Sequence, residues 1–248
     1  MITLKSQREI ELMRAAGRVV AEVLQTLEQA IYPGITTAEL DKLAEKQIRK
    51  AKCQPAFLGY QNFPASICTS VNEEVVHGIP SLRKLKEGDI VSIDVGAVYQ
   101  GYYGDAAATF AVGEVDEEDL RLLKATRESL LRGIDQALPG NRLTDISHAV
   151  QTYVEEKGFS VVRNYVGHGI GNRMHEEPQV PNFGKPGRGP RLQAGMALAI
   201  EPMVNSGTWQ VETLQDNWTV VTKDRQRSAH FEHTIVITAG APVIMTAL

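Results

Sequence analysis

The 248-residue sequence has few of the features that mark a secreted, membrane-bound or nucleic-acid-binding protein. Its two cysteines, Cys53 and Cys68, cannot form a disulfide framework of the kind that stabilises small secreted domains. No apolar run reaches the length of a membrane span, and the charged first residues lack the apolar stretch of a signal peptide. The net charge of -4 gives no electrostatic reason to bind nucleic acid or an anionic membrane. We therefore expect a cytoplasmic protein with neither a membrane nor a sequence-specific nucleic-acid partner.

Several familiar catalytic motifs are also missing. The segment His-Glu-Glu-Pro at 175–178 lacks the second histidine of a zinc-protease helix, and its proline would disrupt that helix. There is no C-x-x-C pair, no phosphate-binding loop and no nucleophilic-serine elbow. The glycines at 167, 169 and 171 do not have the dinucleotide-binding spacing. If the protein is an enzyme, its catalytic site must therefore use a different arrangement of residues from these motifs.

The secondary-structure signals occur as two helices followed by strands, twice over. Capping-box patterns open helices at Ser6 and Thr36, and apolar periodicity predicts two more at 116–138 and 144–157. Residues 54–80 are expected to form loops and short strands, and residues 167–191 are expected to be mostly loop, with an exposed basic segment at 184–191. Strands are expected at 90–95, 106–112, 160–166, 196–201, 209–213, 219–222 and 229–238. This order predicts an α+β fold rather than a barrel or a doubly wound sheet.

Two aspartates flank the best-defined hairpin of the sequence. If the turn is centred between Tyr99 and Gln100, Asp94 and Asp105 lie opposite each other on one face, with Cβ atoms about 4.5–5.5 Å apart. Two ionised carboxylates at roughly 5 Å repel each other by about 3 kcal/mol at an effective dielectric constant near 20. The pair therefore requires a retained proton or a cation between the carboxylates. Taken alone, the pattern also fits two exposed aspartates beside a loop.

An internal repeat changes that interpretation. Four features occur in the same order in both halves. Pro33-Gly34 recurs as Pro139-Gly140, His77-Gly78-Ile79 recurs as His168-Gly169-Ile170, the segment from Leu85 to Asp94 recurs from Leu192 to Glu201, and Asp105 is matched by Glu232. We therefore expect one catalytic domain over residues 1–248, made of two equivalent halves at about 1–115 and 116–248. A pseudo-twofold axis would bring Asp94, Asp105, Glu201 and Glu232 together.

Four carboxylates in one cleft cannot all remain ionised without cations. Two divalent ions would balance four negative charges, and carboxylates with one or two imidazoles suit manganese, iron or cobalt more than a structural zinc. The alternative is a set of buried acids paired with lysine or arginine, but the repeated motifs themselves carry no such partner near the acids.

The sequence closely resembles the type I methionine aminopeptidases, which belong to the pita-bread metallopeptidases. The matching stretches cover essentially the whole chain: Val71-Asn72-Glu73, His77-Gly78-Ile79-Pro80, Ile93-Asp94-Val95, Gly104-Asp105, Gly167 to Gly171, His175 to Pro178, Ile200 to Met203, Asp216 to Thr219 and Glu232-His233-Thr234. The resemblance implies a pseudo-twofold duplicated antiparallel sheet with helices packed on its outer face.

The resemblance also implies a set of functional residues. The five metal ligands would be Asp94, Asp105, His168, Glu201 and Glu232, with Asp105 and Glu232 bridging two divalent ions (cobalt, manganese, iron, zinc or nickel). His77 and His175 would act on the substrate, and Glu201 would carry a proton to the leaving amine. A methionine pocket would be formed by Phe57, Tyr60, Phe63, Cys68, Met174 and Trp218. Phe57, Phe63 and Met174 depart from the residues usual in bacterial members, which leaves the side-chain tolerance of the pocket open.

The implied reaction is removal of the initiator methionine from nascent proteins and peptides that have a small second residue. By the same resemblance, a monovalent cation would bind near Asn72 and Ser228, and the protein would act as a monomer. Contact between the basic segment 184–191 and a ribosome is left open by the sequence. Two rival interpretations remain at this point: another pita-bread hydrolase, such as a proline-specific aminopeptidase, and a non-catalytic binding module with the same fold.

Overall fold

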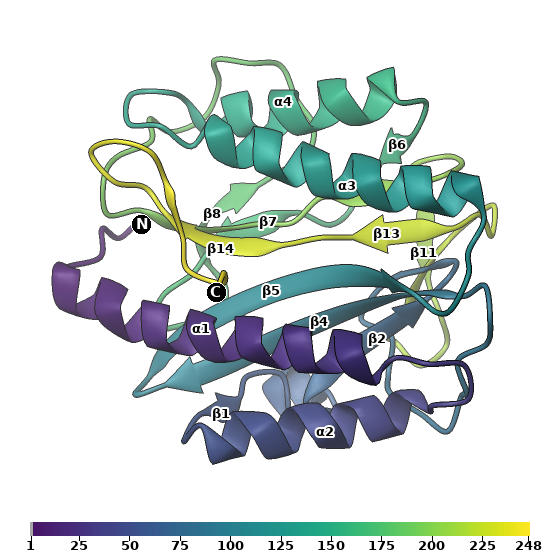
Figure 1. Cartoon of the computed structure of the whole chain (residues 1–248). Helices are drawn as coiled ribbons and strands as arrows, with labels where there is room; N and C mark the ends of the chain where they lie inside the picture. The colour runs from purple at the N-terminus through teal and green to yellow at the C-terminus, as the bar shows by residue number, and fades with distance from the viewer. Residues whose placement is uncertain (1) are drawn as a thin grey trace.

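In the computed structural model, which describes residues 2–248, two pairs of helices flank a layer of antiparallel strands (Figure 1). The first pair packs beside a long hairpin of the N-terminal half, and the second pair packs on strands of the C-terminal half. This confirms the expected α+β architecture. The helices are α1 (Gln7–Ala30), α2 (Thr37–Lys50), α3 (Glu117–Asp135) and α4 (Leu143–Glu156).

Local sequence accounts for where the helices begin. The Ser6 and Thr36 side chains each accept a hydrogen bond from the backbone of a glutamate three residues later, and those glutamates, Glu9 and Glu39, accept from the cap backbone in return. Asp116 caps α3 in the same way, through the backbone N–H of Asp119. Each helix then buries one apolar stripe against the strands. None of the helices within residues 2–248 is long and apolar enough to span a membrane.

The strands form four antiparallel sheets. The four-stranded sheet contains β1 (Gln54–Pro55), β2 (Ile67–Val71), β4 (Ile90–Tyr99) and β5 (Tyr102–Ala111). The five-stranded sheet contains β7 (Gly167–Gly169), β8 (Glu176–Val180), β9 (Ala197–Ile200), β14 (His233–Val236) and β15 (Val243–Ile244). One three-stranded sheet contains β6 (Ser160–Val161), β10 (Met203–Asn205) and β13 (Ser228–His230). The other contains β3 (Glu74–Val76), β11 (Val211–Thr213) and β12 (Val220–Thr222). One short 3-10 turn, η1 (Tyr60–Asn62), precedes β2.

Several strand predictions need correction. The strand expected at 160–166 is limited to β6, and the strand expected at 229–238 is interrupted between β13 and β14. The expected loop at 167–191 contains β7 and β8, and β10 was not anticipated. Strand β7 was not predicted because two of its three residues are glycines, which are uncommon in strands. The glycines allow the β7 backbone to approach that of β8 closely, since a Cβ on Gly169 would lie 2.2 Å from the Glu177 carbonyl oxygen.

The register of the β4–β5 hairpin also differs from the prediction. Its turn is Gln100-Gly101, in which both residues have positive φ, and Asp105 pairs with Gly96 while Asp94 pairs with Ala107. Asp94 and Asp105 are therefore diagonal neighbours on one face rather than directly opposed residues. They remain within reach of each other, because diagonal pairs on one face are about 7–8 Å apart or less.

The two halves meet along β5 and the segment 230–234, which we call the seam. The Thr234 hydroxyl donates to the Asp105 carbonyl oxygen and accepts from the Asp105 backbone N–H, at 2.8 and 3.0 Å. The Glu232 backbone N–H donates to the Ala107 carbonyl oxygen at 2.9 Å. These bonds hold Asp105 and Glu232 beside each other although they are far apart in the sequence.

Candidate metal centre

The five predicted ligands come from different strands and line a single cavity of about 170 Å³. Asp94 and Asp105 lie on β4 and β5, His168 lies on β7, Glu201 follows β9, and Glu232 lies between β13 and β14. The structure thus brings together all five residues that the sequence singled out. The antiparallel pairing of β7 with β9 and of β9 with β14 places the last three side by side.

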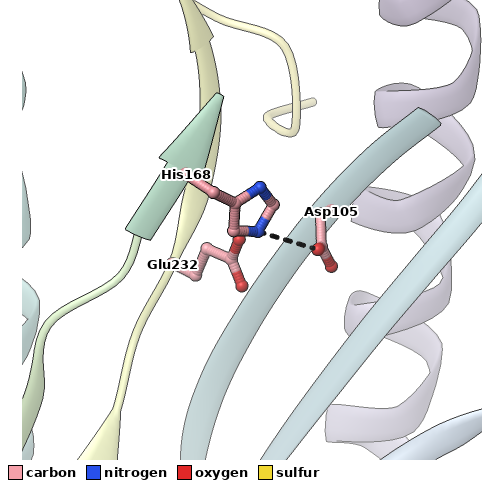
Figure 2. A group of neighbouring side chains, drawn as sticks. All are labelled: Asp105, His168 and Glu232. Carbon is pink, nitrogen blue, oxygen red and sulfur yellow. Dashed lines mark ion pairs between the residues drawn. The ribbon is translucent and has the colours of Figure 1, made fainter. Parts of the chain in front are cut away.

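The side chains converge on one point. His168 Nε2 lies 3.9 Å from Asp105 Oδ2 and 3.6 Å from Glu201 Oε1. One ligand atom from each of Asp105, His168 and Glu232 lies within 4.8 Å of the others. Figure 2 shows the His168 ring directed toward the Asp105 carboxylate, with Glu232 beside it. Atoms that each bind one cation at about 2.0–2.2 Å must lie this close together.

Burial makes this cluster of acids electrostatically strained. Burial raises the pKa of Asp94 to about 7, although a hydrogen bond with Asp105 opposes the shift. Burial, followed by repulsion from neighbouring carboxylates, raises the pKa values of Asp105, Glu201 and Glu232 well above their ordinary values. Burial also lowers the pKa of His168 to about 4, which keeps its imidazole neutral and able to bind a metal.

The donor set fits divalent cations. Asp94 Oδ1, Asp105 Oδ1 and Glu232 Oε1 are buried without a hydrogen-bond partner. Within residues 2–248, the ion pairs of the five ligands involve only the imidazoles of His168 and His230, so lysine and arginine do not neutralise the acids. Buried polar atoms normally have partners. A cation bound by these oxygens and the His168 nitrogen would supply the missing partner.

The two other predicted histidines lie on the rim of the same cavity. Burial lowers the pKa of His77 to about 4, and its ring meets Tyr165 and Trp218 edge-on at centroid distances of 5.6 and 6.2 Å. The His175 ring centroid lies 4.3 Å from that of His168, and Nδ1 of His175 is 2.7 Å from the Tyr60 hydroxyl. With the phenol as the donor, His175 carries its proton on Nε2.

The predicted substrate pocket forms the apolar wall of this cavity. Phe63 and Trp218 meet edge-to-face at 5.0 Å, and Phe57 lies against Gly96, where a Cβ would approach the ring to 2.7 Å. The structure places all six predicted pocket residues along the cavity wall, together with Gln61, which the sequence did not suggest: Phe57, Tyr60, Phe63, Cys68, Met174 and Trp218. An engineered apolar cavity of about 150 Å³ holds one benzene molecule, and this whole cavity, including the space beside the predicted ligands, has a similar volume.

The predicted monovalent-cation residues lie away from this cavity. The Asn72 side chain accepts from Ile90 N and Arg227 Nη1 and donates to Asp89, while the Ser228 hydroxyl donates to Asn205 Oδ1 at 2.9 Å. Both side chains are therefore already engaged with protein groups. Cation binding near them stays a prediction.

Sequence reasoning missed one histidine at the centre. His230 is 2 % exposed, and its Nε2 lies 3.8 Å from Glu201 Oε2. It stands two residues before Glu232, so the period-two pattern of the expected strand could have placed it on the same face.

Comparison with known proteins decides the family. The sequence pattern of metallopeptidase family M24 matches residues 11–239. The chain belongs to metallopeptidase family M24. This M24 metallopeptidase is 58% identical over 247 residues to the methionine aminopeptidase of Clostridium acetobutylicum, covering 99% of both chains. Its structure matches that of the Thermotoga maritima methionine aminopeptidase with a TM-score of 0.99 and 51% identity over the whole of both chains.

More distant M24 structures share the fold alone. The Xaa-Pro dipeptidase of Bacillus anthracis aligns with a TM-score of 0.78 at 23% identity, over 98% of this chain and 61% of that one. The metallopeptidase described here therefore has the pita-bread fold that its sequence predicted. This distant likeness carries no information about the substrate.

Proposed function

We propose that this metallopeptidase is a methionine aminopeptidase that removes the first residue from peptides and nascent chains beginning with methionine. The single observation that carries the proposal is the small cavity in which four carboxylates and an imidazole, all side chains of metal-ligand type, adjoin an apolar wall. The full-length identity of 58% to a protein named methionine aminopeptidase supports the same substrate. The expected preference for a small second residue is part of this proposal.

Asp94, Asp105, His168, Glu201 and Glu232 would hold two divalent cations, with Asp105 and Glu232 shared between them. Such cations lower the pKa of a bound water toward neutrality and polarise a carbonyl oxygen. The number of ions is predicted from the four negative charges of the carboxylates, and their identity is predicted from the mainly carboxylate ligand set.

The protein's own side chains would do the remaining work. His175, with its proton on Nε2, would donate to the oxygen of the scissile carbonyl as negative charge develops there. His77, which lines the same cavity, would contact the scissile amide nitrogen. Glu201 would carry a proton to the leaving amine, a role that suits a carboxyl group whose pKa burial has raised.

The deciding experiment is reconstitution of the metal-free protein with single divalent metals, assayed on short peptides. We expect cleavage of Met-Ala and Met-Gly peptides, little cleavage when the second residue is large, and none of Xaa-Pro peptides. Faster cleavage of Xaa-Pro peptides would instead make the enzyme proline-specific. A protein that bound no divalent metal would be a non-catalytic module.

Four further predictions accompany this proposal. The protein is expected in the cytoplasm, as a monomer, and as one catalytic domain of two equivalent halves. The basic segment 184–191 exposes Lys185, Arg188 and Arg191, which would suit contact with the phosphates of a ribosome near the emerging chain.

A further inference from the structure

His230 is a fully buried histidine that the proposed reaction does not use. Its side chain is 2 % exposed, and its Nε2 has no hydrogen-bond partner. Buried polar groups without a partner are uncommon and usually have a specific reason. Because His230 is not among the residues that line the cavity, this reason is not direct contact with the substrate.

Two imidazoles bracket the carboxylate of Glu201. His168 Nε2 lies 3.6 Å from Oε1, and His230 Nε2 lies 3.8 Å from Oε2. The two oxygens therefore have different neighbours: one faces the cluster of predicted ligands, and the other faces a residue outside it. When Glu201 is ionised, as a metal ligand must be, its oxygens can only accept a hydrogen bond, so the nitrogen of His230 that faces Oε2 pairs with it as an N–H.

The backbone of His230 is held in place independently of Glu201. Its N–H donates to Thr109 Oγ1 at 2.9 Å, and Thr109 Oγ1 donates to its carbonyl oxygen at 2.9 Å. Thr109 also contacts Ser92 Oγ at 2.8 Å, which ties this point of the seam to β4. A side chain on such a fixed backbone is well suited to orient a neighbour.

We propose that His230 is a positioning residue that donates its Nε2–H to Glu201 Oε2, leaving Oε1 as the single oxygen that Glu201 presents to a metal. This inference rests on the proposed function, in which Glu201 is a ligand and carries a proton. The 3.8 Å separation must shorten by about 0.6 Å or more to reach hydrogen-bond distance, and such bonds commonly tighten when a site is filled. Partners of this kind behind a metal ligand typically contribute 10–100-fold to metal affinity.

The test compares two substitutions at this position. His230→Leu removes the donor, whereas His230→Gln keeps an amide N–H of similar reach. His233→Gln is the matched control, because His233 is a half-buried histidine that borders a different pocket, where Nδ1 contacts Thr246 Oγ1. Each metal-free protein is titrated with Mn²⁺ by calorimetry, and kcat and KM are then measured with a Met-Ala peptide. If His230→Leu does not fold, His230→Asn, whose amide is too short to reach Glu201, takes its place.

We expect the leucine or asparagine variant to bind Mn²⁺ at least about 10-fold more weakly, with lower kcat and KM nearly unchanged. The glutamine variant should recover most of the affinity, and the His233 control should behave as wild type. Equal affinity in the leucine variant and the wild type would overturn the proposal. So would a glutamine variant as weak as leucine, or an effect confined to KM. If the wild-type protein bound Mn²⁺ but cleaved no methionyl peptide, the proposed function would be wrong. The Mn²⁺ affinities of the variants would still test whether His230 positions Glu201.

Discussion

Tyr60 lines the apolar wall of the cavity and also contacts His175, one of the predicted catalytic residues. Its hydroxyl lies 2.7 Å from His175 Nδ1, and the two residues come from opposite halves of the chain. With the phenol as the donor, the bond places the His175 proton on Nε2 and orients the ring. We therefore expect Tyr60 to position His175 as well as to line the predicted methionine pocket.

Replacing Tyr60 with phenylalanine should lower kcat by about 3–10-fold without unfolding the protein. A neutral hydrogen bond is worth about 0.5–1.5 kcal/mol, and about 1.4 kcal/mol corresponds to a factor of ten. The measurement is kcat with a Met-Ala peptide, together with the melting temperature. Tyr165→Phe is the control, because its hydroxyl points to Thr213 and its loss should change kcat by less than about twofold. Equal effects of the two substitutions would contradict the assigned role.

Asp94→Asn should separate stability from activity. Burial raises the pKa of Asp94 to about 7, so in the metal-free protein at pH 8 this carboxylate is ionised at a cost that the unfolded chain does not bear. The asparagine variant should therefore be more stable without metal, by on the order of 1–3 kcal/mol. It should also bind Mn²⁺ far more weakly and lose at least about 100-fold in kcat. Thermal melts and metal titrations at pH 8 test both effects, and a less stable metal-free variant would refute the electrostatic explanation.

The four acids could be predicted as a metal site because they lie in repeated motifs and their charges together require cations. The roles of His175 and of the pocket residues were predicted from the family resemblance alone. His230 could not be assigned a role, since no sequence pattern shows that its free nitrogen faces Glu201. The Tyr60–His175 bond was equally hidden, because residues 115 positions apart meet only in the folded chain.

At the scale of elements, α1 and β5 are in contact through glycines. A Cβ on Gly104 would lie 2.6 Å from the Gly17 backbone nitrogen, and a Cβ on Gly17 would lie 2.4 Å from the Met245 carbonyl oxygen. Helix and strand can approach this closely only where neither residue has a side chain. Asp105 follows Gly104 directly, so the packing of α1 sets the position of a predicted ligand.

Gly104→Ala should therefore destabilise the protein by about 1–3 kcal/mol, the usual cost of overpacking, and weaken Mn²⁺ binding by shifting Asp105. Denaturant unfolding and metal titration measure the two effects. Gly240→Ala is the control, since the nearest atom to an added Cβ there is 4.0 Å away. If Gly104→Ala lowered stability but left metal affinity unchanged, β5 would not transmit the strain to Asp105.

The helices were predictable to within a few residues, because their caps and apolar stripes are local features. The hairpin register was not. Its turn requires Gln100 to adopt a φ of 48°, which glutamine rarely does and which no residue in Tyr-Gln-Gly-Tyr signals. Short strands such as β7 and β10 depend on distant partners, and local propensity does not reveal them.

For the whole molecule, the buried acids predict an unusual dependence of stability on pH. Above about pH 7.5, a full unit beyond their ordinary pKa of about 6.5, the histidines of the unfolded chain are largely neutral, so the buried histidines contribute little to the slope. Unfolded carboxylates are ionised there, while the native chain still holds protons on acids whose pKa values are raised. The native state thus binds more protons than the unfolded state, and its stability must fall as pH rises.

We expect the melting temperature of the metal-free protein to decrease between about pH 7.5 and 8.5, and that of the Mn²⁺-saturated protein to remain nearly constant. Metal binding displaces the retained protons, so the stabilisation by Mn²⁺ should increase with pH. Thermal melts with and without Mn²⁺ across this range provide the test. A metal-free protein that became more stable toward pH 8.5 would show that the acids are not buried together.

The seam gives the cluster a kinetic property as well as a geometry. Thr234 and Thr109 tie the backbones on either side of Asp105 and Glu232, the two acids expected to share both ions. The two halves cannot spread apart without drawing these oxygens away from each other. The carboxylates should therefore keep their spacing when a chelator removes the ions, so added metal should restore binding at once, without a slow rearrangement of the chain.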